Sequence, residues 1–287
     1  MSKSSDTPQP ALAVSRQLQH STVRLECTKA DGSLSSGTGF HMRLQLDEKT
    51  LVPAIVTNKH VVSDSVECAI HLTLADEKGA SLGVHERYVI KPFQWLNHPD
   101  DNVDLALIPL QPLLIQLATM GKRPFYIDLS EAVISDAAAI AKLSPLEEIL
   151  MVGYPNGIWD SANNFPIFRR GITATACNLN YQGRPEFLVD AAVFPGSSGS
   201  PVFIFNEGTY VDGNSIIFGE RLLFVGILYA VHLHTAQGEI RTVTVPTDTK
   251  SMAFSAIPNN LGICIHSAKV LDFKDALRAI IASGAAA

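Results

Sequence analysis

Cysteine is scarce in this chain, which has four in 287 residues, Cys27, Cys68, Cys177 and Cys264. They lie far apart, so the sequence has no CxxC pair, the spacing typical of zinc sites and of thiol redox motifs. The absence of such motifs leads us to expect reduced thiols, no metal site and no cofactor.

Long apolar runs are missing as well. The first residues, MSKSSDTPQPALAVSR, contain only the short run PALAV, which is too short for the core of a secretion signal. The stretch LALIPLQPLLIQLATM from Leu105 is broken by two prolines and two glutamines, so it does not resemble a membrane span. We therefore expect a cytoplasmic protein whose thiols are reduced and which has no membrane partner.

The chain also lacks an excess of positive charge. It has 22 Lys and Arg against 28 Asp and Glu, a formal net charge of -6. Nucleic acids and anionic membranes select basic surfaces, so we expect neither as a partner. Hydrophobic residues make up 46% of the chain, enough for a sizeable core, which excludes disorder for most of it.

Short β-rich runs dominate what is present. They fill the chain from Thr22 to Leu110, separated by turn residues such as Asp31 and Gly32, and they return from Glu148 to His266. Many short strands without helices between them are typical of a sandwich or a barrel. The sequence therefore predicts an all-β fold with two β-rich halves.

Two segments depart from this pattern. The stretch SEAVISDAAAIAKL from Ser130 is rich in alanine and starts with serine, which predicts a short helix between the halves. In SAKVLDFKDALRAIIASG, apolar residues recur on one helical face, which predicts an amphipathic helix packed on the body. The predicted organisation is a mobile tail over 1–18, a first β unit over 19–115, a connector over 116–147, a second β unit over 148–267 and a helix over 268–283.

Three serines crowd into AVFPGSSGSPVF, residues 191–202. A serine hydroxyl is a poor nucleophile at neutral pH, so hydrolysis needs a base, an orienting carboxylate and donors for the oxyanion. Ser198 lies between glycines, which allow the N–H groups of Gly196 and Ser198 to turn inward as such donors. Alone, a Gly/Ser stretch is typical of a turn, so the residues elsewhere in the chain decide between a turn and a catalytic serine.

Two upstream residues supply that context. His60 follows an apolar strand, and Asp104 begins the run DLALIPL. Each alone is typical of a structural histidine or of a turn carboxylate. The chain order His60, Asp104, Ser198, however, is one of the known orders of a catalytic triad. The three residues together predict a base, an orienting acid and a nucleophile.

The segments TNKHVV, VDLALIPL and DAAVFPGSSGSPVF resemble the three catalytic segments of chymotrypsin-like (trypsin-like) serine proteases, most closely the bacterial HtrA type without its PDZ domain. SSGTGFHM, ILMVGYPNG, LFVGILYAVH and LGICIHSAKV are similar to further strands of that family, so the likeness covers about residues 22–275. The resemblance implies one trypsin-like peptidase domain, built as a double barrel of two six-stranded antiparallel β-barrels with a C-terminal helix.

The same resemblance implies a serine endopeptidase that acts on a protein or peptide substrate. His60 would take the proton of Ser198 during attack on the peptide carbonyl, while Asp104 orients His60. The N–H groups of Gly196 and Ser198 would form the oxyanion hole. Residues 158–168 fall where related enzymes become ordered on activation, so an unknown activator is a further expected partner.

The resemblance also implies an S1 pocket, lined by Ala192, Val193, Leu228, Tyr229, Ala230 and His266. Trypsin-like enzymes that cut after Lys or Arg carry an Asp where this chain has Ala192, so a small or medium apolar P1 residue is expected. Glutamyl endopeptidases place a His where this chain has Leu228, which argues against cleavage after Glu.

Departures from the family pattern keep two alternatives open. Ser197 and Ser200 replace commoner residues of the nucleophile motif, and the chain has no Ile-Val-Gly-Gly-like start for zymogen activation. A catalytically silent protease-fold binding module would retain the same triad residues. An esterase of the α/β-hydrolase type is disfavoured, because it needs Gly-x-Ser-x-Gly and a His after the nucleophile.

Overall fold

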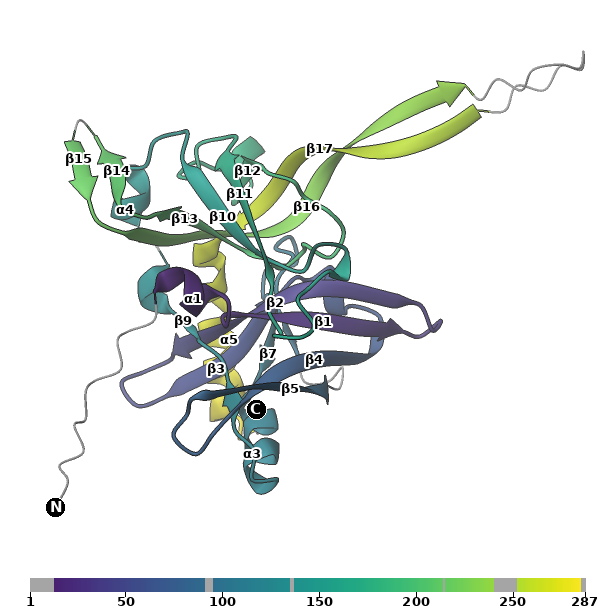
Figure 1. The fold of residues 1–287 in the computed structure, drawn as a ribbon, viewed down its shortest axis with the longest axis vertical. Coiled ribbons are helices and arrows are strands. Elements are labelled where there is room, and N and C mark those ends of the chain that lie inside the picture. Colours follow the sequence, from purple (N-terminus) through teal and green to yellow (C-terminus); the bar gives the residue numbers. More distant parts are fainter. Residues whose placement is uncertain (1–12, 91–94, 135–136, 214, 240–251, 285–287) are drawn as a thin grey trace, which may run out of the picture.

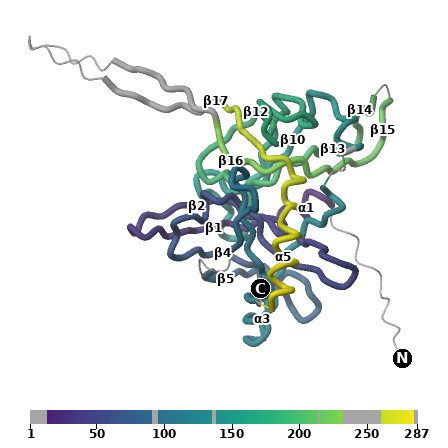
Figure 2. The backbone as a smooth tube through the Cα atoms, turned by 180° about the vertical axis from the view of Figure 1, so that it is seen from behind, coloured from purple at the N-terminus to yellow at the C-terminus, as the bar shows by residue number. Residues whose placement is uncertain are grey.

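The computed structural model describes residues 13–90, 95–134, 137–213, 215–239 and 252–284. Strands form two layers, one from the first half of the chain and one from the second, and the C-terminal helix α5 runs beside them (Figures 1 and 2). The prediction of a mostly β protein with two β-rich halves is therefore confirmed.

The first half forms one large sheet of nine strands, paired in the order β5-β4-β1-β2-β3-β7-β6, with β8 on β4 and β9 on β2. Its strands are β1 (Thr22–Lys29), β2 (Leu34–Gln45), β3 (Leu51–Thr57), β4 (Ser65–Ala75), β5 (Ser81–Ile90), β6 (Leu96–Asn97), β7 (Ala106–Pro109), β8 (Pro124–Phe125) and β9 (Leu129–Ser130). All pairs are antiparallel except β2 with β9.

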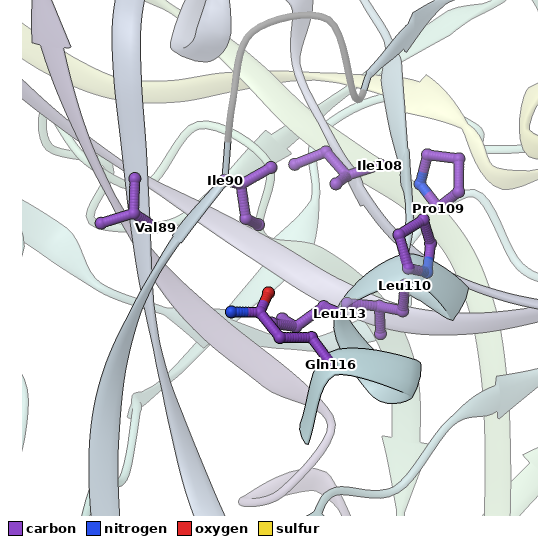
Figure 3. Close-up of a pocket in the computed structure, with 8 residues that line it drawn as sticks. Val89, Ile90, Ile108, Pro109, Leu110, Leu113 and Gln116 are labelled. Carbon is purple, nitrogen blue, oxygen red and sulfur yellow. The ribbon is translucent and has the colours of Figure 1, made fainter. Parts of the chain in front are cut away.

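The prediction of a six-stranded first barrel is wrong in strand number and in closure. β5 and β6 are the two ends of the hydrogen-bonded path, so the ladder does not close within the described residues. The additional strands β6, β8 and β9 have two residues each, too few to show a period in the sequence. Near the open edge of β5, a cavity of about 270 Å³ lies against β7 and the helix α3 (Gln111–Thr119), lined mainly by apolar side chains such as Ile90, Ile108 and Leu113 (Figure 3).

The second half forms a closed six-stranded barrel in the order β10-β11-β12-β17-β16-β13, as predicted. Its strands are β10 (Glu148–Gly153), β11 (Ile167–Thr173), β12 (Glu186–Asp190), β13 (Pro201–Asn206), β16 (Arg221–Glu239) and β17 (Met252–His266). A separate hairpin pairs β14 (Thr209–Asp212) with β15 (Ser215–Phe218).

Helices are few and short. They are α1 (Val14–Leu18), α2 (Lys59–Val62), α3, α4 (Ala137–Ala141) and α5 (Phe273–Ala282), with 3-10 turns at Glu131–Val133, Pro155–Gly157, Tyr181–Gly183 and Ser267–Asp272. The predicted connecting helix corresponds to α4, and the predicted C-terminal helix to α5. The helix α3 was not predicted, although Pro112 in its first turn is a typical start signal. No helix in the described ranges has the length and apolar character needed to cross a membrane.

Cys27 and Cys68 form a disulfide, which corrects the prediction that all thiols are reduced. The antiparallel register of β1 and β4 places the two cysteines directly opposite each other. Spacing along the chain could not reveal this pair, because it depends on strand register. Cys177 and Cys264 are free and buried. The cytoplasmic location, predicted in part from reduced thiols, loses that support.

One apolar cluster spans the two layers. Phe40 of β2 and Phe224 of β16 meet edge to face, 5.3 Å between ring centroids, and both are fully buried. Phe273 and Leu277 of α5 belong to the same apolar cluster. On the surface of α5, Arg278 donates to the carbonyl oxygen of Leu46 at 2.7 Å, which ties the helix to the first sheet. This shared cluster packs the second barrel against the first sheet.

Candidate active site

The proposed nucleophile lies in a tight loop between β12 and β13. Within it, the Ser197 N–H donates to the Phe194 carbonyl oxygen and the Ser200 N–H to the Ser197 carbonyl oxygen, each at 3.0 Å. Gly196 and Gly199, on either side of Ser198, have φ of +85° and +86°, a left-handed conformation that favours glycine. The glycines noted in the sequence therefore bend the chain around a half-buried Ser198.

His60 and Asp104 are in direct contact. Asp104 Oδ2 lies 2.5 Å from His60 Nδ1, and Asp104 Oδ1 accepts the backbone N–H of His60 at 3.1 Å. The backbone of Asp104 is held as well, because the Asn58 side-chain amide donates to its main-chain carbonyl oxygen at 2.7 Å. One aspartate thus fixes both the ring and the backbone of the histidine.

The loop that carries Ser198 packs against β2 and against the end of β3, the strand that precedes His60. The Thr38 N–H donates to the Ser198 carbonyl oxygen at 2.8 Å, and a side chain at Gly199 would lie 2.8 Å from Thr57 Oγ1 at the end of β3. In this structure the Ser198 hydroxyl donates to the Tyr229 carbonyl oxygen at 3.4 Å. The nucleophile loop therefore lies against the strand that leads to His60, while the catalytic roles of the three residues stay predictions.

The peptide that precedes Gly196 is held on its carbonyl side. The Pro195 carbonyl oxygen accepts the Asn156 N–H at 2.5 Å, and the chain has no cis peptide among the described residues. A trans peptide points its C=O and N–H in opposite directions, so the Gly196 N–H faces away from Asn156. Within the described ranges, neither the Gly196 nor the Ser198 N–H has a hydrogen-bond acceptor. Two free donors therefore flank Ser197.

The predicted S1 residues do not all lie together. Ala192 is exposed, whereas Val193 and Leu228 are buried in the core of the second barrel, and Tyr229 and Ala230 are half-buried. His266 pairs with Gly226 and stacks on Phe187. Since Asp190 pairs with Leu261 and Glu186 with Ile265, His266 lies at the opposite end of the β12–β17 ladder from Ala192.

The pKa values of Tyr229 and His266 are shifted from their usual values. Burial, followed by a 2.8 Å hydrogen bond to the Glu186 carboxylate, raises the pKa of the Tyr229 hydroxyl above its usual value. Burial lowers the pKa of His266, which favours the neutral imidazole. Both shifts favour the uncharged form of the side chain.

The loop after Asn156 packs against the first sheet. Trp159 contacts the rings of His71 and His85, at centroid distances of 4.9 and 5.3 Å. The Arg24 guanidinium lies over the same indole ring, and its Nε donates to the Gly157 carbonyl oxygen at 3.1 Å. These contacts connect the first sheet to the loop that holds the Pro195 carbonyl.

Thr38 and Asn156 hold the nucleophile loop from outside, and neither is among the site residues predicted from the sequence. The segments SSGTGFHM and ILMVGYPNG that contain them were recognised only as strands. Asn156 contacts the loop through its backbone N–H, and the Thr38 hydroxyl donates to a backbone carbonyl oxygen, so neither contact follows from a pair of residue types. As for metals, the described ranges hold no group of three or more His, Cys, Asp or Glu side chains that could bind an ion.

Known proteins with sequences similar to this chain include proteins described as serine endoproteases. The chain is 28% identical over 178 residues to a "Probable periplasmic serine endoprotease DegP-like" of Marinomonas sp., a match that covers 62% of this chain and 30% of the relative. A protein of the same description from Bartonella henselae is 29% identical over 192 residues, covering 64% of this chain and 29% of the relative. The matched region thus spans less than a third of the length of these relatives.

Solved structures of proteases are also similar. "HtrA-type protease AlgW with tripeptide" is 16% identical with a TM-score of 0.47, and the match covers 94% of this chain and 62% of that one. A protease from M. tuberculosis in its active form is 17% identical with a TM-score of 0.43, covering 92% and 84%.

The family model of the trypsin-like peptidase domain matches residues 37–211, more than half of the chain. This range contains His60, Asp104 and the whole nucleophile loop. The chain therefore belongs to the family of trypsin-like peptidase domains.

Proposed function

We propose that this protein is a serine endopeptidase that cleaves peptide bonds through Ser198, His60 and Asp104. The observation that carries the proposal is the contact of Asp104 Oδ2 with His60 Nδ1 at 2.5 Å, beside a loop with two free N–H donors. The carboxylate keeps the imidazole proton on Nδ1, which leaves Nε2 free to accept a proton. The histidine is thereby prepared to act as a base.

The reaction follows from this arrangement. Ser198 Oγ leaves the Tyr229 carbonyl, gives its proton to His60 Nε2 and attacks the substrate carbonyl carbon. The Gly196 and Ser198 N–H groups stabilise the resulting oxyanion, an effect of about 3 kcal/mol per donor in a comparable protease. His60 then passes the proton to the leaving amine, and water hydrolyses the acyl-enzyme.

We further propose that the P1 residue is small or medium-sized and apolar. Ala192 has no charge, and the neighbouring Val193 and Leu228 are apolar. The carboxylate of Glu186 accepts the Tyr229 hydroxyl at 2.8 Å, so it is already engaged within the barrel. We also propose an activator that acts on the loop around Trp159. That loop follows Asn156, whose N–H donates to the Pro195 carbonyl oxygen of the nucleophile loop.

A fluorophosphonate probe tests the nucleophile. We expect the wild-type protein to be labelled and Ser198→Ala to lose all labelling, measured by mass spectrometry. Ser197→Ala is the matched control, because its buried hydroxyl has no partner in the described part of the chain and its loss should leave labelling intact. A wild type that stays unlabelled, also after incubation with peptides that could serve as activators, would identify the silent binding module instead.

A peptide library tests the specificity. Cleavage should concentrate after Val, Ala, Leu and similar residues, because Ala192, Val193 and Leu228 carry no charge. Mass spectrometry of the products reads out each cleavage site, and Ser198→Ala is the blank. Dominant cleavage after Arg, Lys or Glu would refute the apolar P1 assignment, and a labelled protein that cuts esters but no peptide would be an esterase.

A further inference from the structure

Thr38 has more contacts with the nucleophile loop than any residue predicted from the sequence. It lies in β2 of the first sheet and is fully buried. Its hydroxyl donates to the Gly196 carbonyl oxygen at 3.0 Å. Thr38 Oγ1 in turn accepts the Tyr154 N–H at 3.1 Å and the Ser200 hydroxyl at 3.2 Å. A side chain of the first sheet thus joins three segments of the second barrel.

These three partners use the full capacity of the Thr38 hydroxyl. A hydroxyl has one hydrogen to donate and two lone pairs that accept. With the donor and both acceptors engaged, its orientation is determined, and a buried network that is fully satisfied is rigid. The Thr57 hydroxyl adds a further restraint, since it donates to the Thr38 carbonyl oxygen at 2.8 Å.

Thr38 contacts the peptides that lie directly next to the two peptides carrying the oxyanion donors. The donor N–H groups belong to the peptides 195–196 and 197–198. Thr38 holds the two neighbouring peptides. Its hydroxyl donates to the Gly196 carbonyl oxygen of peptide 196–197, and its N–H donates to the Ser198 carbonyl oxygen of peptide 198–199. The direction of each donor therefore depends on peptides that Thr38 anchors.

Thr38 also reaches the support on the other side of the loop. It accepts the N–H of Tyr154, and two residues later Asn156 donates its N–H to the Pro195 carbonyl oxygen. The ring end of Tyr154 is fixed as well, because its hydroxyl donates to the Thr22 carbonyl oxygen at 3.3 Å. One threonine thus connects the loop with the segment that orients its first peptide.

We propose that the Thr38 hydroxyl is a positioning group that holds the Gly196 and Ser198 N–H donors in the direction required to bind an oxyanion. This inference rests on the proposed function. Thr38 touches neither substrate nor reacting atoms; it acts through the loop.

The pair Thr38→Val and Thr38→Ser tests this role. Valine keeps the shape of threonine and removes the hydroxyl, whereas serine keeps the hydroxyl. Since one oxyanion donor is worth about 10²–10³-fold in kcat, we expect Thr38→Val to lower kcat by about 10- to 100-fold with KM nearly unchanged. Thr38→Ser should stay within about threefold of the wild type, because its hydroxyl can make the same contacts.

Amide hydrogen exchange supplies a readout that does not require catalysis. The peptide that covers residues 194–200 should exchange faster in Thr38→Val than in the wild type or in Thr38→Ser. Thr22→Val is the matched control, because Thr22 is also buried in the first sheet but its hydroxyl has no partner in the described part of the chain. That variant should change neither exchange in the loop nor kcat.

The outcomes separate the two proposals. Unchanged exchange in Thr38→Val would overturn the anchoring role whether or not the protein is an enzyme. Faster exchange with an unchanged kcat would overturn the positioning role in catalysis. A wild type that never reacts with fluorophosphonate would refute the proposed function and the catalytic part of this inference with it, while hydrogen exchange would still decide whether Thr38 holds the loop.

Discussion

The Asp104→Asn variant should lose about 10⁴-fold in kcat, the loss known for the equivalent change in a Ser-His-Asp protease. Asp104 Oδ2 lies 2.5 Å from His60 Nδ1, and Asp104 Oδ1 accepts the His60 backbone N–H at 3.1 Å. An asparagine that keeps the backbone contact through its carbonyl oxygen must turn its NH₂ group towards Nδ1. Nδ1 would then accept a hydrogen bond, and the imidazole proton would move to Nε2. In that tautomer His60 cannot take the proton of Ser198.

Steady-state kinetics on a peptide substrate measures this effect. KM should change little, because Asp104 does not touch the substrate, and thermal unfolding should show that the variant is folded. Asp101→Asn is the matched control, since Asp101 is exposed three residues earlier and the change removes the same charge. A loss of less than tenfold in Asp104→Asn, or an equal loss in Asp101→Asn, would refute the role assigned to Asp104.

The parts of the fold that could be predicted are those whose signal is local. The alternation of strand residues and the amphipathic face around Phe273 and Leu277 can be read within a few residues, and both the second barrel and α5 are present. The helix α3 begins at Gln111, directly after an apolar run that is typical of a strand, so the start signal at Pro112 alone does not separate the two elements. The disulfide between Cys27 and Cys68 depends on the pairing of β1 with β4, which spacing does not encode.

In the candidate site, too, features with a local signal could be predicted, and features that depend on tertiary contacts could not. Gly196 and Gly199 could be predicted to bend the chain, because glycine is the residue that favours the positive φ observed there. The approach of Asp104 to His60 was expected from a family resemblance, whereas its geometry required the structure. Thr38 and Asn156 could not be predicted from the sequence, because they contact Pro195, Gly196 and Ser198 at the backbone carbonyl oxygen, which every residue type has. The support of the oxyanion donors is thus a property of the fold rather than of a motif.

This dependence on the fold leads to a second large expected effect, at Gly199. Gly199→Ala should lower the free energy of unfolding by at least about 4 kcal/mol, which is at the upper end for a single substitution. The added Cβ would lie 1.9 Å from the Thr38 carbonyl oxygen and 2.8 Å from Thr57 Oγ1. A backbone oxygen cannot rotate away as a flexible side chain can, so β2 or the nucleophile loop must move. That movement would break the contact between the Thr38 N–H and the Ser198 carbonyl oxygen at 2.8 Å.

Urea unfolding of Gly199→Ala and of a matched variant, Gly79→Ala, separates this clash from backbone strain. Gly79 has φ of +83°, close to the +86° of Gly199, but a Cβ there would meet nothing within 4 Å. Gly79→Ala should therefore lower the free energy of unfolding only by the strain of a left-handed alanine, about 1–2 kcal/mol. The difference between the two variants measures the contact between the nucleophile loop and β2. Equal losses would mean that Gly199 is needed for its φ alone and that the loop does not press against Thr38.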